Sequence, residues 1–211
     1  MTGAWVWAVA ALAYGAFAAW YFNWRGRIRA DEVDGYVTRI RSVNPHSADR
    51  TADGILRKFL EEDDGREFFM LNLVRLATGE VKDPKTGALR PARAVMQDYT
   101  NAFLPALIAR GGHPAMVARK AGGYVDSWGV EADPGWSVVG YMRYRSRRDM
   151  AELASDPRFG GGHEFKFAAV PVTLSFPTQP MVLALLSPRV WVALMLALLA
   201  ALAQIAILLS Q

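Results

Sequence analysis

Apolar residues are concentrated at the two ends of this chain, in the stretches Ala4–Phe22 and Val190–Leu209. At about 1.5 Å per helical residue, each stretch approaches the roughly 30 Å hydrocarbon thickness of a bilayer. Ser187 and Pro188 precede the second stretch, and serine at the N-cap with proline at the first helical position is typical of a helix start. The pattern predicts one transmembrane helix at each end of the chain.

Aromatic and arginine side chains gather at the ends of both apolar stretches. Trp and Tyr are enriched at membrane interfaces, and Arg and Lys stay on the cytoplasmic side. We therefore expect a membrane protein with two spans, a cytoplasmic central domain and both termini on the opposite side of the membrane. A cleaved signal peptide is the alternative, but Met1-Thr2-Gly3 lacks the basic residues of one. The predicted interface residues are Trp5, Trp7, Trp20, Trp24, Arg25, Arg27, Arg29, Arg189 and Trp191.

Small residues recur four positions apart in both predicted spans. Such rows let helices approach closely, although alanine is also simply common in these stretches. The predicted helix-packing residues are Ala11, Gly15, Ala19, Ala193, Ala197 and Ala201.

The central part of the chain divides into a helical segment and a mixed segment. Asp31–Val43 and Ser47–Glu62 read as two polar-rich helices separated by the breaker Asn44-Pro45. They predict a juxtamembrane helical collar. The expected domains are residues 1–24 (first span), 25–64 (collar), 65–178 (α+β domain) and 187–210 (second span).

The mixed segment alternates between strand and helix patterns. Phe68–Leu76 is a short, nearly continuous apolar run, which predicts a central strand. Leu73→Asp should therefore abolish folding, because an unpaired buried carboxylate is costly. Gly79–Pro91 reads as a polar loop. The remaining predicted elements are the helix Ala92–Arg110 with a kink or break at Pro105, the strands Ala115–Ala121, Tyr124–Val130 and Trp136–Tyr144, the helix from Ser146 to Ala154, a short segment around Phe165–Val170 and the strand Val172–Phe176. This order predicts an α+β fold of the ferredoxin-like type with an antiparallel sheet.

Composition excludes several classes of protein. All charged residues lie between Arg25 and Arg189, which is incompatible with an ordinary soluble globule. Cysteine is absent, so disulfide scaffolds, iron–sulfur clusters and thiol catalysis are excluded. A net charge of +4 is small and is partly used at the membrane boundary, so we expect no nucleic-acid partner.

The central segment contains the motifs Phe69-Met70-Leu71-Asn72-Leu73-Val74-Arg75, Tyr99 with Pro105 and Gly111-Gly112, Trp136, Tyr144-Arg145-Ser146-Arg147 and Asp156-Pro157-Arg158-Phe159. Together these motifs resemble a bacterial family of unknown function in the dimeric α+β barrel superfamily. The resemblance covers about Glu67 to Phe176 and excludes both spans and the collar. It implies that two units pair their sheets into a barrel with an internal cleft, in a superfamily that includes small monooxygenases and haem-degrading enzymes. Fold alone does not choose among these activities.

His163 and Asn72 are the weak candidates for a catalytic role. The family resemblance implies a His-Arg pair where this chain has Phe165-Lys166, and His163 lies two positions earlier. The alternative for His163 is a polar residue on an exposed glycine-rich loop. The three histidines lie in separate segments without metal-ligand spacing, so we expect neither a metal nor a cofactor.

Polar and aromatic residues of the predicted strands and helix are candidates for lining a ligand cleft. Aromatic side chains supply apolar area, and a few polar groups supply orientation. Core packing or a dimer interface is the alternative role. The candidates are Asn72, Arg75, Tyr99, Trp128, Trp136 and Tyr141.

The leading functional hypothesis is a non-enzymatic accessory or scaffolding subunit, present as a homodimer or within a larger membrane complex. An enzyme needs at most one span to stay at a membrane. Two spans with rows of small residues also supply surfaces for packing against other helices. One alternative is a small monooxygenase- or isomerase-like enzyme acting on an apolar membrane-derived substrate. Another is a haem- or lipid-binding sensor, for which a cleft-facing His163 would be the discriminating feature.

Overall fold

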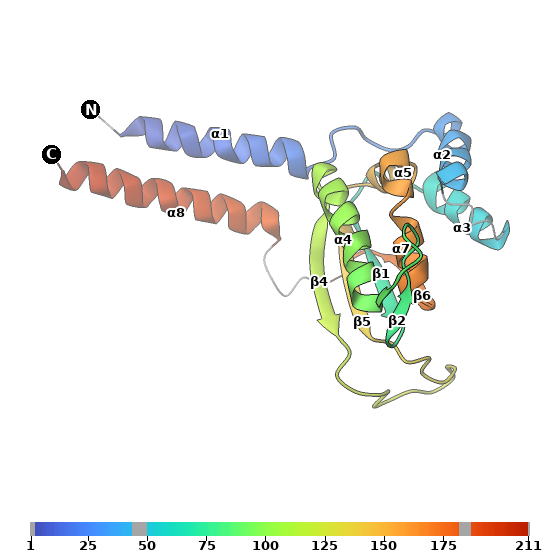
Figure 1. Ribbon diagram of the computed structural model, residues 1–211. Helices are drawn as coiled ribbons and strands as arrows, with labels where there is room; N and C mark the ends of the chain where they lie inside the picture. Colours follow the sequence, from blue (N-terminus) through green and yellow to red (C-terminus); the bar gives the residue numbers. More distant parts are fainter. Residues whose placement is uncertain (1–2, 44–49, 182–186, 211) are drawn as a thin grey trace. The chain divides into compact units, whose positions relative to one another are not determined.

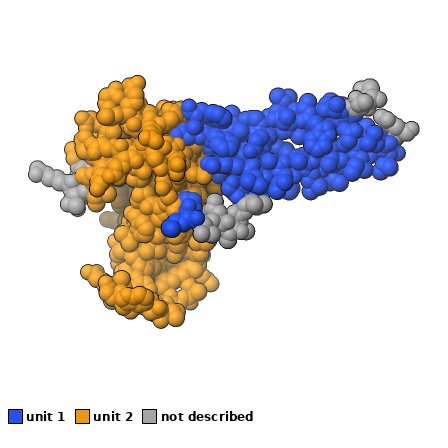
Figure 2. All heavy atoms as spheres, turned by 180° about the vertical axis from the view of Figure 1, so that it is seen from behind, with its two compact units in different colours: residues 1–24, 180–211 blue, residues 25–179 orange. Residues whose placement is uncertain are grey.

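The computed structural model describes residues 3–43, 50–181 and 187–210 (Figure 1). These residues form two compact units, coloured separately in Figure 2. The first unit comprises both ends of the chain, Met1–Trp24 and Pro180–Gln211, and the second comprises Arg25–Gln179.

The first unit is a pair of apolar helices that lie side by side, α1 (Ala4–Tyr21) and α8 (Pro188–Leu209) (Figure 1). Both are long and apolar enough to cross a membrane. As predicted, Ser187 is the N-cap of α8 and Pro188 its first residue. The Tyr14 hydroxyl donates a hydrogen bond of 3.1 Å to the carbonyl oxygen of Arg189, which ties the two helices together at one end.

The two rows of small residues differ in their surroundings. Ala11, Gly15 and Ala19 of α1 are all exposed, since α1 buries Val6 and Tyr21 instead. On α8, Ala200 is the buried residue, while Ala193 and Ala201 are half-buried and Ala197 is exposed. The row on α1 therefore lies outside the contact between α1 and α8.

The predicted interface residues are mostly exposed, and two of the arginines are paired with carboxylates. Trp5, Trp7, Trp24 and Trp191 are exposed, whereas Trp20 is half-buried. Arg25 contacts Glu152 at 2.7 Å, and Arg29 contacts Asp31 at 2.9 Å. Part of the positive charge that follows the first apolar stretch is therefore neutralised within the second unit.

The second unit contains a four-stranded antiparallel sheet in the order β4-β5-β1-β6. Its strands are β1 (Phe68–Arg75), β4 (His113–Arg119), β5 (Val138–Tyr144) and β6 (Val172–Thr178). Strand β1 pairs with β5 on one side and β6 on the other, which confirms the predicted central strand. The helices that follow the strands are α4 (Ala92–Ala109), α5 (Arg147–Ala154), α6 (Pro157–Gly160) and α7 (His163–Ala169), so the fold is α+β.

Two expected elements differ in the structure. The polar loop at 79–91 contains a hairpin of β2 (Glu80–Lys82) and β3 (Leu89–Pro91), because the Asp83 carboxylate accepts the N–H groups of Lys85 and Thr86 and so closes the turn. The expected strand Tyr124–Val130 is absent. The pairing of β4 with β5 stops at Arg119 opposite Val138, and the intervening loop leaves Val125 fully exposed.

The expected break at Pro105 is also absent, and α4 runs continuously past it. Proline removes one backbone hydrogen bond from a helix interior. Burial of Phe103 and Leu107 on the same helix offsets that cost by anchoring both sides of the proline in the core.

The collar helices α2 (Ala30–Val43) and α3 (Arg50–Glu61) share a core with the sheet. Val33, Tyr36 and Leu60 pack in the same cluster as Phe68 of β1. The guanidinium of Arg148 on α5 donates to both carboxylate oxygens of Glu32 on α2, at 2.5 and 2.9 Å. The collar is therefore an integral part of the second unit.

Candidate functional site

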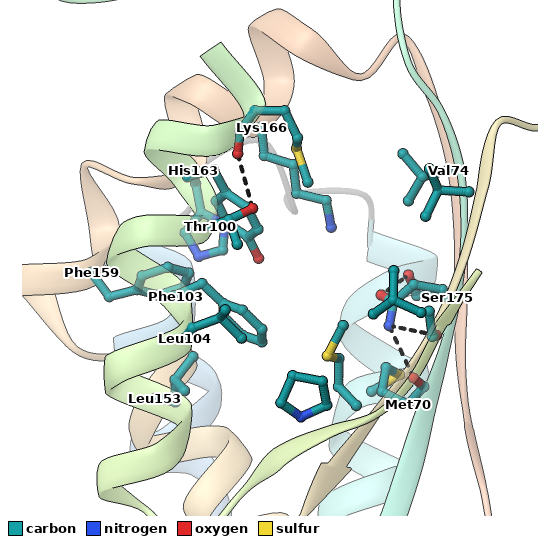
Figure 3. A pocket seen from close by; sticks show the side chains of 18 of the residues that line it. Met70, Val74, Thr100, Phe103, Leu104, Leu153, Phe159, His163, Lys166 and Ser175 are labelled. Atoms are coloured by element: carbon teal, nitrogen blue, oxygen red, sulfur yellow. Dashed lines mark hydrogen bonds between the residues drawn. The ribbon is translucent and has the colours of Figure 1, made fainter. Parts of the chain in front are cut away.

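A cavity of about 550 Å³ lies in the second unit between one face of the sheet and the helices α4 to α7 (Figure 3). Its walls are mostly apolar. The lining residues are Met70, Asn72, Val74 and Leu76 of β1 and its end, Arg93, Met96, Gln97, Tyr99, Thr100, Phe103 and Leu104 of α4, Pro114 and Val117 of β4, Val138, Gly140, Met142 and Tyr144 of β5, Met150, Leu153 and Ala154 of α5, Phe159 of α6, His163 and Lys166 of α7, and Ser175 of β6.

Strand alternation decides which residues form the floor of the cavity. Successive side chains of a strand point to opposite faces, so Met70, Asn72 and Val74 face the helices while Leu71 and Leu73 face away. Asn72 pairs in register with Gly140 of β5. Because glycine has no side chain, this position leaves open space in the middle of the floor.

Asn72 is held by neighbouring strands. Its Nδ2 donates to the carbonyl oxygen of Met70 at 2.9 Å, and its Oδ1 accepts a hydrogen bond of 2.8 Å from Ser175 of β6. These bonds satisfy a polar side chain within an otherwise apolar floor. Asn72 thus links β1 to β6 and presents a fixed amide to the cavity.

His163 lies on the opposite wall, at the first residue of α7, and it does not lie on an exposed loop. Its ring is 4.6 Å from the Phe159 ring centroid and 6.2 Å from that of Tyr99. Burial, with a smaller effect of the positive charge of Lys166, lowers the pKa of His163 to about 4. The glycine before it serves close packing, since a Cβ on Gly162 would lie 3.0 Å from the Phe159 carbonyl oxygen.

Lys166 lies about one helical turn after His163 and projects from α7 toward the sheet (Figure 3). Its Nζ is 5.7 Å from the centre of the Tyr99 ring, a cation–π contact. Burial lowers the pKa of Lys166 and raises the pKa of the Tyr99 hydroxyl. Tyr99 itself is fixed by stacking on Phe103, with ring centroids 5.5 Å apart.

The structure brings Asn72, Tyr99 and His163 together around one cavity but places the other four candidates outside it. Arg75 donates to the carbonyl oxygen of Pro134 at 3.0 Å, and Trp136 donates through Nε1 to the hydroxyl of Tyr124 at 3.0 Å. Trp128 is 81% exposed in the loop between β4 and β5. Tyr141 pairs with Leu71 and so lies on the opposite face of the sheet.

Sequence reasoning placed Phe165-Lys166 at the position of the implied His-Arg pair but did not name Lys166 as a cavity residue, and it missed four methionines. A signal for Lys166 exists, because His163 and Lys166 are three residues apart and so share one helix face. The methionines come from β1, α4, β5 and α5, which no local pattern connects. Methionine is flexible and fills irregular space. They are Met70, Met96, Met142 and Met150.

Within residues 3–43, 50–181 and 187–210, no group of three or more His, Asp or Glu side chains is placed to hold a metal ion.

The chain matches no known protein-family model and no curated protein. Its fold is similar to that of the RPA0582 protein of unknown function from Rhodopseudomonas palustris, at 21% identity and a TM-score of 0.51, over 62% of this chain and 94% of that one. The methylated form of the RPA0582 protein matches at 20% identity and a TM-score of 0.52, over 63% and 93%. At these identities the similarity is one of fold.

Proposed function

We propose that this protein is a membrane-anchored binding protein whose α+β unit holds an apolar small molecule. This proposal rests on the cavity between the sheet and the helices. Its volume of about 550 Å³ lies within the range of small-molecule sites, about 300–1,000 Å³. Its walls combine many apolar side chains with a few fixed polar groups such as Asn72, which is the usual composition of such sites.

The surroundings of His163 favour binding over catalysis. General acid–base chemistry needs a side chain oriented by a second polar group and a pKa near the working pH. His163 instead packs against the rings of Phe159, Tyr99 and Phe167, and its pKa of about 4 keeps it neutral. A cleft-facing histidine is the feature expected of the haem- or lipid-binding alternative, so the accessory-subunit hypothesis becomes the second candidate.

Purification of the full chain into lipid nanodiscs tests the binding function. Mass spectrometry of an organic extract identifies a bound lipid-like molecule, and visible absorbance identifies haem. We expect one bound apolar molecule per chain, and its loss in Gly140→Leu. That substitution fills the floor of the cavity and is tolerable, because the nearest atom to the new Cβ is the flexible end of Met142 at 3.3 Å. Identical extracts from both proteins would contradict a ligand in this cavity.

We further propose that the second unit has the ferredoxin-like fold and that its sheet pairs with the sheet of a second copy of the chain. The strand order β4-β5-β1-β6, with helices following β1 and β5, supports the topology. Leu174 and Phe176 are 48% and 43% exposed on the sheet face opposite the cavity. Burial of such residues between two sheets would stabilise a homodimer.

The two apolar helices are proposed to span the bacterial inner membrane, with the second unit in the cytoplasm. The arginines at 25, 27, 29 and 189 support this orientation. Reporter fusions after Gln211 and within the turn at 83–87 should report opposite sides of the membrane. Export of the turn would overturn the orientation, and a mature N-terminus near Ala19 would overturn the uncleaved first helix.

A subunit role within a larger membrane complex is the second candidate, supported by the exposed row on α1. Because Ala11, Gly15 and Ala19 remain exposed beside α8, they are available to a further helix. Gly15→Leu should reduce recovery of any partner, whereas Val9→Leu, at another exposed position of α1, should not. Equal recovery in both variants would remove this candidate.

A further inference from the structure

The cavity contains a positively charged side chain in an apolar wall. Lys166 is half-buried, and its Nζ contacts the face of Tyr99. None of the described residues that line the cavity is acidic. A buried charge is costly unless it is paired, so an anionic group inside the cavity would be strongly favoured beside Lys166.

Polar and apolar groups occupy different parts of the cavity. Arg93 and Gln97 lie in the first two turns of α4, which packs along α7 beside Lys166. Both are exposed, so they lie where the cavity meets solvent. Phe103 and Leu104 lie further along α4, and they are joined by apolar residues of α5. Figure 3 shows Lys166 at one end of the labelled residues and Phe103, Leu104 and Leu153 toward the other.

We propose that the ligand is an amphiphile with a carboxylate head and a long apolar body, such as a fatty acid, and that Lys166 binds the carboxylate. The head group lies beside Lys166 and Tyr99, and the apolar body extends among Met70, Met142 and Leu153. Flexible methionines accommodate a chain that lacks a rigid shape. This assignment rests on the proposed binding function and adds the chemistry of the ligand.

Binding of matched amphiphiles to the full chain in nanodiscs tests the assignment, with empty nanodiscs subtracted as background. The probes are decanoic acid, decan-1-ol and decyl phosphate. A charge-assisted hydrogen bond favours the acid over the alcohol by about 10- to 100-fold in affinity. Lys166→Met should abolish the preference, so that decanoic acid and decan-1-ol bind that variant with about the same affinity. Lys166→Arg keeps the charge and should keep the preference.

The matched control is Lys58→Met, because Lys58 lies on α3 with a side chain 74% exposed and does not line the cavity. It should bind all three probes as the unmodified protein does. A Lys166→Met protein that keeps its preference for the acid, or an unmodified protein that binds acid and alcohol equally, would overturn the role of Lys166 while leaving the binding function intact. Tighter binding of decyl phosphate would overturn the carboxylate assignment. Failure of all three probes to bind would count against the binding function itself.

Discussion

The imidazole of His163 meets the ring of Phe159 edge to face, with centroids 4.6 Å apart and ring planes at 64°. This contact holds the histidine in an aromatic wall, although three glycines precede it in the sequence. The ring is therefore fixed by packing, and its environment opposes the charged form.

His163 should remain neutral well below the ordinary histidine pKa of about 6.5. Burial, followed by the charge of Lys166, lowers its pKa to about 4, and the Tyr99 ring faces it from α4. Histidine NMR signals recorded against pH measure this directly, with His163→Gln giving the assignment. Titration of His163 near its ordinary value would contradict the buried position.

The same shift makes stability depend on pH. The folded pKa is depressed, so the unfolded chain binds more protons between about pH 6.5 and 4. The free energy of unfolding contributed by His163 is therefore present above about pH 6.5 and decreases as the pH falls toward 4. Denaturant titrations should show a steeper loss of stability between about pH 6.5 and 4 in the unmodified protein than in His163→Gln, because the substitution removes this term.

Ser146→Ala should destabilise the second unit by about 1–2 kcal/mol. The Ser146 hydroxyl accepts the backbone N–H of Asp149 at 3.1 Å as the N-cap of α5, and Ser146 is fully buried. Alanine would leave that N–H unpaired inside the protein. Thermal unfolding measures the loss, and Ser155→Ala at the other end of α5 is the control. An equal loss of stability in the two variants would show that the Ser146 cap makes no specific contribution to stability.

Glu32→Gln should destabilise the contact between α2 and α5 by about 1–2 kcal/mol near neutral pH, since Glu32 is partly exposed. Hydrogen bonds from Arg148, and then from the Arg29 N–H, lower the pKa of Glu32 to about 2. The stabilisation is present above the ordinary pKa of about 4.3 and is lost as the pH falls toward 2. Chemical denaturation at several pH values should show a larger loss of stability at low pH in the unmodified protein than in Glu32→Gln. Glu61→Gln, at an exposed ion pair of α3, should have little effect; a comparable effect would contradict a special role of Glu32.

Leu73→Asp and Val74→Asp should behave differently, although the residues are adjacent. Val74 is 7% exposed and packs with Val95 and Phe165, so a carboxylate there should prevent folding. Leu73 is half-buried on the opposite face of the sheet, between Val139 and Leu174. The expectation that Leu73→Asp abolishes folding therefore changes: we now expect a folded chain that does not form the proposed homodimer. Circular dichroism and light scattering in detergent separate these outcomes, and an unfolded Leu73→Asp protein would contradict an open sheet face.

The sequence by itself determined those features that depend on neighbouring residues. The two apolar helices follow from uninterrupted hydrophobic length, the central strand β1 from the run Phe68–Leu76, and the start of α5 from the capping residue Ser146. In each case the signal lies within one short stretch of the sequence, even where, as in β1, the pairing strands come from far along the chain. The candidates Asn72, Tyr99 and His163 were likewise recognisable by residue type, though not as members of one cavity.

Only the tertiary structure decided the cavity and the end of the sheet. Asn72 meets Gly140 and Ser175, which are 68 and 103 residues away, because of the register of three strands. Tyr124–Val130 has a strand-like composition but no paired neighbour, so it remains a loop. Local patterns specify which face of an element is apolar, whereas strand register specifies what that face meets. The open space above Gly140 depends on strand register, and the contact of Lys166 with Tyr99 depends on the packing of α7 against α4. Both features bring together residues from distant elements.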